Sequence, residues 1–257
     1  MIDVREVALG YGDCVFLRGI TLGVRSGEVL ALVGPNGVGK TTLLRAMVGL
    51  HSPSAGDVLI DGLPLRGMAA RERARRVALV SADAPVVEGL CVREVVASGR
   101  LPYRPWWQWS AHAEDDDAVD DALRRTELEE HAQRSFHALS SGERQRVWIA
   151  LALAQRARTL LLDEPTSHLD VRHAFEALRM LRAFAAGGHA AVVVLHDLNL
   201  AAAFADRIAL LGCGTLLECG EPGRALDESL LRQAYGVRID VQRQPDGRVV
   251  AFANPNA

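Results

Sequence analysis

A glycine-rich run near residue 34 has the residue types that bind a triphosphate. Its residues fit the pattern GxxxxGK[ST] in full, and they are Gly34, Pro35, Asn36, Gly37, Val38, Gly39, Lys40 and Thr41. Glycines let backbone N–H groups approach phosphate oxygens closely, and the start of a following helix attracts anions. Lys40 adds a positive charge between the β- and γ-phosphates, and the Thr41 hydroxyl can bind Mg²⁺. Because an apolar strand precedes the run and a helix follows it, we predict a nucleoside-triphosphate site that also includes Thr42.

Two carboxylates end a second apolar run. Asp163 and Glu164 follow residues 159–162, which read Thr-Leu-Leu-Leu. Ligands bind at the carboxyl ends of parallel strands, so we expect both side chains on the same face as the phosphate loop. Asp163 is predicted to hold Mg²⁺ through water, and Glu164 to polarise or deprotonate a water aimed at the γ-phosphate. The alternative is that the two residues only cap the next helix.

Six motifs in a fixed order resemble those of the ATPase subunit of ABC transporters, over nearly the whole chain. They are an aromatic A-loop at Tyr11, the phosphate loop, an LSGGQ-like signature at Leu139–Glu143, the acidic strand, a D-loop at 167–170 and a switch histidine at His196. The resemblance implies that Tyr11 stacks on adenine, that Asp170 belongs to the nucleotide site, and that His196 contacts the γ-phosphate. Tyr11 could instead be an ordinary loop tyrosine, and His196 a structural histidine.

The signature lies at the predicted start of a helix. Backbone amides at Ser141 and Gly142, with the Ser140 hydroxyl, form an anion site there. The resemblance implies that this site, with Glu143, faces the phosphate loop of a second subunit, so that two chains enclose two ATP molecules. The family consensus has Gly and Gln where this chain has Ser141 and Glu143. Ser140 with Glu143 three residues later also fits a helix capping box.

One family position is different in a way that affects chemistry. The resemblance places Ala82 where ABC ATPases normally have a glutamine that contacts Mg²⁺ and the attacking water. Alanine offers no donor or acceptor, and Asp83 or Ser81 could substitute, with Asp83 the better metal ligand. We therefore predict slow or partner-dependent hydrolysis.

Two further stretches resemble importers of iron-siderophore, haem and cobalamin type. The first is residues 92–100 with the tryptophans that follow, Trp106, Trp107 and Trp109, and the second is residues 196–201 with the end at 234–237. The tryptophans are candidates for contact with a permease, or they pack under the helical insertion. The nearby acidic run 114–117 is expected to be the solvated start of a helix.

The elements that must position these residues alternate between strand and helix. Continuous apolar runs predict strands buried on both faces, and Ala/Leu/Arg-rich stretches predict helices. The predicted strands are 29–33, 77–80, 159–162 and 192–195, and the predicted helices are 40–49, 142–155, 171–186 and 199–206. Antiparallel strands or hairpins are expected at 2–7, 21–24 and 208–218.

We expect a single α/β domain over residues 1–257. It would be a P-loop NTPase (RecA-like) core at about 1–82 and 158–240, with an antiparallel β subdomain. Residues 83–157 lose the strand pattern and become helical and charged, which predicts an inserted helical subdomain. Residues 237–253 are expected to form a β-hairpin.

Composition excludes several other classes of protein. The 29 Lys and Arg against 32 Asp and Glu leave no positive excess for nucleic acid. The apolar run 183–195 is interrupted and shorter than the roughly 20 residues of a membrane span. The four cysteines show no CxxC spacing, which favours a reduced, cytosolic setting over a disulfide framework.

We therefore expect an ATP-binding and hydrolysing subunit that uses Mg²⁺ and lies on the cytoplasmic face of the inner membrane. The expected partners are a second copy, a separate permease and a substrate-binding protein. The alternatives are a soluble ABC protein of translation or DNA repair and a weakly hydrolysing or non-hydrolysing regulator. The cargo, which is contacted by the permease and the binding protein, stays open among siderophore, haem and cobalamin.

Overall fold

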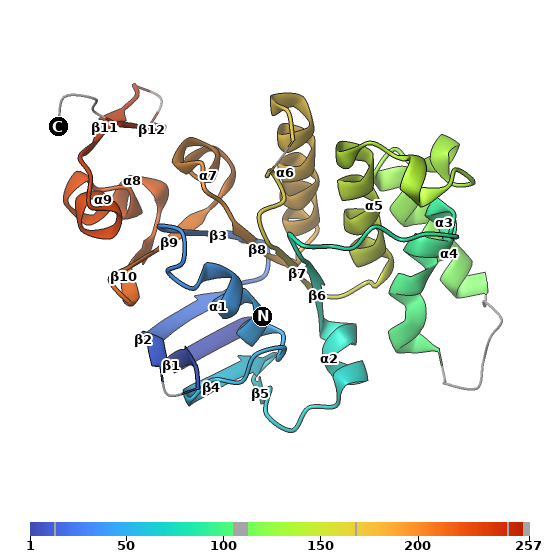
Figure 1. The fold of residues 1–257 in the computed structure, drawn as a ribbon, viewed down its shortest axis with the longest axis horizontal. Coiled ribbons are helices and arrows are strands. Elements are labelled where there is room, and N and C mark those ends of the chain that lie inside the picture. The colour runs from blue at the N-terminus through green and yellow to red at the C-terminus, as the bar shows by residue number, and fades with distance from the viewer. Residues whose placement is uncertain (13, 105–112, 168, 246, 254–257) are drawn as a thin grey trace. The chain divides into compact units, whose positions relative to one another are not determined.

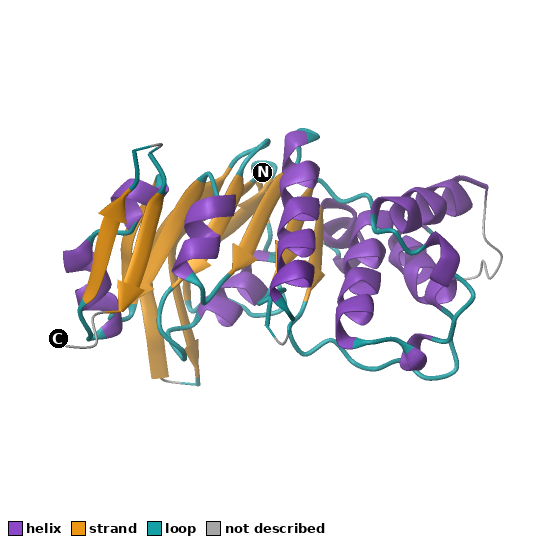
Figure 2. Cartoon of the chain, turned by 90° about the horizontal axis from the view of Figure 1, so that it is seen from above, coloured by secondary structure: helices purple, strands orange, loops and turns teal. Residues whose placement is uncertain are grey.

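The computed structural model describes residues 1–12, 14–104, 113–167, 169–245 and 247–253. The chain divides into two compact units, one formed by Met1–Gly67 with Arg182–Ala257 and the other by Met68–Leu181. Strands dominate the first unit and helices the second (Figure 1, Figure 2). Each unit is described by itself below.

The first unit contains two sheets and a hairpin. Its elements are β1 (Ile2–Tyr11), β2 (Cys14–Val24), β3 (Val29–Val33), α1 (Lys40–Met47), β4 (Ala55–Ile60), β5 (Leu63–Pro64), β8 (Ala190–Val194), α7 (Leu198–Phe204), β9 (Arg207–Gly212), β10 (Thr215–Gly220), α8 (Pro222–Ala225), α9 (Glu228–Tyr235), β11 (Ile239–Arg243) and β12 (Val249–Ala253). An antiparallel sheet has the strand order β2-β1-β4-β5. In the other sheet β3 lies between β9 and β8 in parallel, and β10 is antiparallel to β9. β11 and β12 form the expected hairpin.

Strand β3 leads directly to the phosphate loop. All five of its residues are buried, as expected for a central parallel strand covered on both faces. Its register pairs Val29 with Ala191 of β8 and Leu30 with Arg207 of β9. Because β3 and β8 are parallel, the loop after β3 and the segment with His196 after β8 leave the sheet at the same edge.

The second unit is a helical group joined to a pair of parallel strands. Its elements are α2 (Ala70–Arg76), β6 (Val77–Val80), α3 (Val92–Ala97), η1 (Ser98–Tyr103), α4 (Ala113–Arg125), η2 (Glu129–His131), η3 (Phe136–Ala138), α5 (Ser141–Ala154), β7 (Thr159–Leu162) and the first part of α6 (Val171–Ala186). Helices α3, α4 and α5 pack on one another. β6 pairs with β7 in parallel, with Val80 opposite Leu162.

The acidic start of α4 is only partly solvated, so the prediction for this run is wrong at one position. Asp115 is buried, and its two carboxylate oxygens accept hydrogen bonds from Arg100 Nε and Arg104 Nε, each at 2.8 Å. Its neighbours Glu114 and Asp116 are exposed, as expected. The sequence pattern places Asp115 in a helix, but it does not show that arginines from another part of the chain reach its carboxylate.

The unit boundaries differ from the expected subdomain limits at 82/83 and 157/158. The second unit also holds β6 and β7, because these strands pair with each other and α2 packs against η1. The division of the whole chain into a core and an inserted helical subdomain therefore stays a prediction.

Candidate nucleotide-binding site

The phosphate loop has the backbone that its glycines predict. Gly34, Gly37 and Gly39 have φ angles of 148°, 78° and 106°, which side-chained residues rarely adopt. Helix α1 begins at Lys40, whose side chain is buried. The Lys40 ammonium donates to the carbonyl oxygens of Gly34 and Pro35 at 2.8 and 3.0 Å. These contacts hold the ammonium at the loop, where its positive charge can pair with an anionic phosphate.

Two aromatic rings contact Tyr11 beside this loop. The Tyr11 and Phe16 ring centroids are 5.6 Å apart with the ring planes inclined by 29°, and the His51 ring meets Tyr11 edge-on at 5.1 Å. The Tyr11 hydroxyl lies 3.3 Å from Oγ1 of Thr42. A Cβ at Gly39 would lie 2.7 Å from a ring carbon of Phe16, so this ring packs directly on the loop. The structure thus brings Tyr11 to the phosphate loop with a largely exposed ring, as an adenine platform requires.

Phe16 and His51 were not predicted from the sequence. Neither belongs to a motif, and each reaches Tyr11 from a different element, β2 and the segment after α1. Their sequence signal is limited to their residue types, an aromatic ring at Phe16 and an imidazole at His51.

His196 follows β8 in the same unit and is exposed. Strand β8 ends at Val194, one residue earlier than expected, although the backbone N–H of Leu195 still donates to Leu32 O at 3.1 Å. Asp197 then caps α7 by accepting from the backbone N–H groups of Asn199 and Leu200. His196 is therefore held between a strand end and a capped helix start.

Asp163 and Glu164 lie in the second unit at the carboxyl end of β7. Asp163 is buried, and its backbone N–H donates to Val80 O at 2.9 Å. Glu164 has a φ of 50°, unusual for a residue with a side chain, and its Oε2 accepts from the Ser167 hydroxyl at 3.2 Å. Since β6 and β7 are parallel, Asp83 follows β6 at the same edge as Asp163.

The signature begins α5 with the capping box that the spacing also allowed. Ser140 Oγ accepts from the backbone N–H of Glu143 at 3.2 Å, and Glu143 Oε2 accepts from the backbone N–H of Ser140 at 2.7 Å. Glu143 Oε1 lies 3.0 Å from His131 Nε2 and accepts from Arg134 at 3.3 Å. The N–H of Ser140, with Arg134 and His131, lowers the pKa of Glu143 to about 2. Glu143 is therefore a carboxylate at neutral pH that fixes the start of the helix.

The D-loop residue Asp170 is tied to the same region. Its Oδ1 accepts from the backbone N–H of His173 and lies 2.9 Å from His173 Nδ1. A Cβ at Gly142 would lie 3.1 Å from the His173 ring, so the glycine permits this close approach. Contact with the His173 backbone N–H lowers the pKa of Asp170.

The predicted site residues thus fall into two groups. Tyr11, the phosphate loop with Thr42, and His196 lie in the first unit, and Asp83, Asp163, Glu164, Asp170 and the signature lie in the second. The joining of the two groups around one nucleotide stays a prediction. Trp106, Trp107 and Trp109, predicted as permease contacts, lie outside the described residues.

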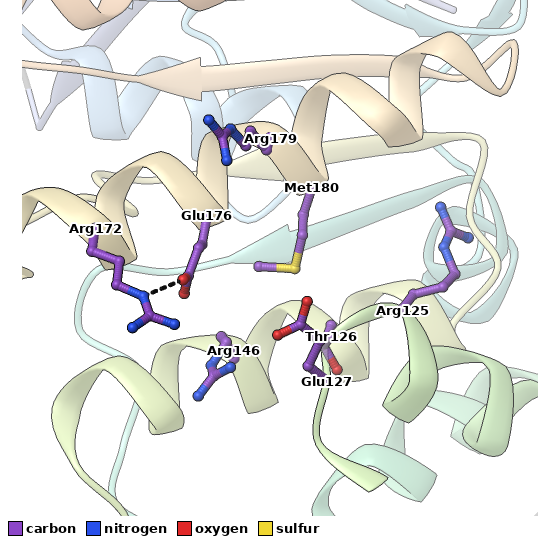
Figure 3. A pocket seen from close by; sticks show the side chains of 8 residues that line it. All are labelled: Arg125, Thr126, Glu127, Arg146, Arg172, Glu176, Arg179 and Met180. Atoms are coloured by element: carbon purple, nitrogen blue, oxygen red, sulfur yellow. Dashed lines mark hydrogen bonds and ion pairs between the residues drawn. The ribbon is translucent and has the colours of Figure 1, made fainter.

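A pocket of about 300 Å³ in the second unit was not predicted (Figure 3). Arg172 and Glu176 on α6 are paired at 2.8 Å, and Arg146 lies on the facing helix α5 with its buried Nε unpaired among the described residues. The lining residues are Arg125, Thr126, Glu127, Arg146, Arg172, Glu176, Arg179 and Met180. None of them belongs to the predicted nucleotide site.

Residues 17–167, more than half of the chain, match the sequence model of the ABC transporter family. The chain belongs to the ABC transporter family. The hemin import ATP-binding protein HmuV of Streptomyces coelicolor is 46% identical over 229 residues, which are 89% of this chain and 81% of HmuV. The petrobactin import ATP-binding protein FpuD of Bacillus anthracis is 37% identical over 246 residues, which are 95% of this chain and 89% of FpuD. A bacterial ABC transporter cassette solved as a dimer has a TM-score of 0.76 at 28% identity, over 86% of this chain and 99% of the cassette.

These relations confirm the predicted fold class and activity. The chain is an ABC ATPase with an α/β P-loop NTPase core, and it is the ATP-binding and hydrolysing subunit of a transporter. Across the described residues, no helix of this ABC ATPase combines the length and apolar character that crossing a bilayer requires.

Proposed function

We propose that this ABC ATPase provides the energy for an importer of haem or of an iron-siderophore complex. The observation that carries the proposal is its identity of 46% and 37% with ATP-binding proteins for hemin and petrobactin import, over about nine-tenths of the chain. Cobalamin is the remaining cargo class that the sequence pattern favours. In this proposal a separate permease and a substrate-binding protein contact the cargo, and the ATPase works on the cytoplasmic face of the inner membrane through the permease.

The active form is proposed to be a dimer around two ATP molecules. The chain has one phosphate loop and one signature, so a complete pair of sites needs two copies. Ser140 and Ser141 are exposed at the start of α5, where the backbone N–H groups of Ser141 and Gly142 can donate hydrogen bonds to a phosphate. The dimeric cassette with 28% identity supports the same arrangement.

Each polar residue of the site has a distinct role in the proposed hydrolysis. Lys40 neutralises the phosphates, and its present carbonyl partners hold it at the loop. Glu164 orients a water and takes its proton. His196 contacts the γ-phosphate through a ring N–H that donates a hydrogen bond to a phosphate oxygen. Tyr11 holds the adenine by stacking, which is tolerant of base identity.

The oxygen donors of the site fit Mg²⁺. The buried carboxylate of Asp163 and the hydroxyl of Thr41, with Asp83 as a further candidate, are hard ligands of the kind that Mg²⁺ prefers. When bound, the ion supplies charge neutralisation between the β- and γ-phosphates. No group of three or more His, Cys, Asp or Glu side chains that could hold a metal by itself occurs within the described parts of the chain. This suits an ion whose ligands are mostly phosphates and water.

The proposal is tested on the complex with its permease in lipid. The Glu164→Gln variant should lose roughly 10²–10⁴-fold in ATPase rate while it still binds ATP, because only proton transfer is removed. Uptake into vesicles is then measured with hemin, a ferric siderophore and cobalamin in separate arms. Transport of none of the three would refute the importer class, and ATP binding without phosphate release by the wild-type complex would favour the regulator.

A further inference from the structure

Helix α9 ends in Ala234-Tyr235-Gly236, a motif to which the proposed chemistry gives no role. The helix starts at a side-chain cap, because Asp227 accepts from the backbone N–H of Ser229 at 2.9 Å. It ends where Gly236 adopts a φ of 72° and donates its N–H to Arg232 O at 2.9 Å. Both ends are thus fixed by local hydrogen bonds, and so is the position of Tyr235 in the last turn.

Ala234 packs this last turn against the end of β9. A Cβ on Gly212 would lie 2.8 Å from Ala234 Cα, closer than two such atoms can approach. The Cys213 thiol also donates to Gln233 O at 3.3 Å. A small residue on each side therefore lets helix and strand touch through their backbones.

The end of β9 touches the phosphate loop from its other side. A Cβ on Gly34 would lie 2.3 Å from the carbonyl oxygen of Leu211, so only glycine fits there. Gly34 also has a φ of 148°, which a side-chained residue rarely adopts. The first residue of the loop, the end of β9 and the last turn of α9 thus form a close-packed group within the first unit.

The Tyr235 hydroxyl is buried in this group, and among the described residues it makes no hydrogen bond of normal geometry. Gly34, the first residue of the loop, contributes a backbone group to the electrostatic surroundings of this hydroxyl. Burial raises the pKa of Tyr235 to about 12, with this backbone group acting in the opposite direction. The hydroxyl is therefore neutral and keeps lone pairs that can accept a hydrogen bond from the loop. The carbonyl of the same Gly34 already accepts from Lys40 at 2.8 Å.

We propose that Tyr235 is a positioning residue for the phosphate loop. Its hydroxyl accepts a hydrogen bond from the Gly34 N–H in the nucleotide-bound loop and stabilises that conformation over the nucleotide-free one. The inference rests on the proposed nucleotide site. In this inference α9, which carries none of the predicted nucleotide-binding motifs, supports the ATP site.

The Tyr235→Phe variant separates this role from a structural one, because the two predict opposite effects on stability. Removing a buried hydroxyl that lacks a good partner leaves the nucleotide-free protein as stable as wild type or more stable. Removing a hydrogen bond that forms with nucleotide weakens ADP binding about fivefold, which is ~1 kcal/mol. Calorimetric titration of the full chain with ADP gives Kd, and thermal unfolding without nucleotide gives Tm.

Two further variants make the result specific. Tyr103→Phe is the matched control, because Tyr103 lies in η1 of the second unit, over Arg100, and neither Kd nor Tm should change. Lys40→Ala tests the loop itself and should abolish ADP binding. An unchanged Kd in Tyr235→Phe overturns the inference, and so does a lower Tm without nucleotide, since that marks a structural hydroxyl. An unchanged Kd in Lys40→Ala overturns the assigned nucleotide site instead.

Discussion

The carboxylate of Glu143 accepts a hydrogen bond from the backbone N–H of Ser140, with 2.7 Å between Oε2 and N. Its other oxygen faces His131 and Arg134, which come from the segment before the signature. The signature glutamate is thus bound on both sides by its own chain. The negative charge of Glu143, together with its hydrogen bonds, stabilises the start of α5.

This relationship predicts a pH-dependent contribution to stability. Because the folded pKa of Glu143, about 2, lies below its ordinary value of 4.5, its charge stabilises the fold fully above about pH 4.5. The contribution is lost as the pH falls toward about 2. Glu143→Gln should therefore lower the free energy of unfolding by roughly 1–3 kcal/mol at pH 6 and by much less at pH 2.5. Urea unfolding at the two pH values measures the difference.

Glu130→Gln serves as the control for this series. Glu130 is exposed and makes no ion pair within the described part of the chain. Its removal should leave the free energy of unfolding nearly unchanged at both pH values. A Glu143→Gln difference that does not depend on pH would mean that the carboxylate acts by shape alone.

A second prediction concerns Asp115, the buried carboxylate between two arginines. Its charge compensates Arg100, which is also buried and donates to Ala154 O at 2.9 Å. Asp115→Asn leaves a buried guanidinium without its counter-charge, which typically costs about 3–5 kcal/mol. For a chain of this size the thermal midpoint should fall by roughly 6–20 °C. Thermal unfolding followed by circular dichroism at 222 nm, which reports the loss of helix, measures the midpoint.

The control for Asp115 is its neighbour Asp117, which is exposed two residues further along α4. Asp117→Asn removes the same charge from the same helix, so its midpoint should stay within about 1–2 °C of wild type. Equal shifts in both variants would show that helix charge, rather than the contact with Arg100, carries the stability.

The sequence predicted the buried elements of this fold better than its edges. The bounds of β3, β6, β7 and α6 agree with the predicted ranges, because a continuous apolar run or a long amphipathic stretch marks each of them. Strand β4 and helix α9 were missed. β4 reads Ala-Gly-Asp-Val-Leu-Ile, which is not a continuous apolar run, and its pairing with β1 is irregular. α9 has its signals in capping residues at Asp227 and Gly236 rather than in a long apolar pattern.

The candidate site divides in a similar way. Motifs with fixed spacing, such as the phosphate loop and the signature, were found because their chemistry lies along one stretch of chain. Phe16, His51 and His131 could not be found in this manner. They reach Tyr11 or Glu143 only through packing between separate elements, and no spacing in the sequence encodes that contact.

A third prediction concerns the aromatic platform. Tyr11→Ala should weaken ATP binding by roughly 5–150-fold, since stacking of a base on an aromatic ring contributes about 1–3 kcal/mol. Tyr11→Phe keeps the ring and loses only the hydroxyl that lies 3.3 Å from Thr42, so its ATP affinity should stay within about threefold of wild type. Titration with ATP in the Glu164→Gln background measures both. Equal losses in the two variants would assign the effect to the hydroxyl and not to the ring.

The last prediction concerns Ala82, which follows β6 and which the family resemblance aligns with a glutamine. Ala82 is exposed, and Asp83 beside it leaves the sheet at the same edge as Asp163. A glutamine at this point would add an amide that can orient the attacking water, so Ala82→Gln should raise the ATPase rate of the assembled complex by about tenfold. Asp83→Asn is the companion variant. If Asp83 already substitutes for the glutamine, Asp83→Asn lowers the rate and Ala82→Gln restores it, whereas an unchanged rate in Ala82→Gln alone would contradict the prediction that this position limits hydrolysis.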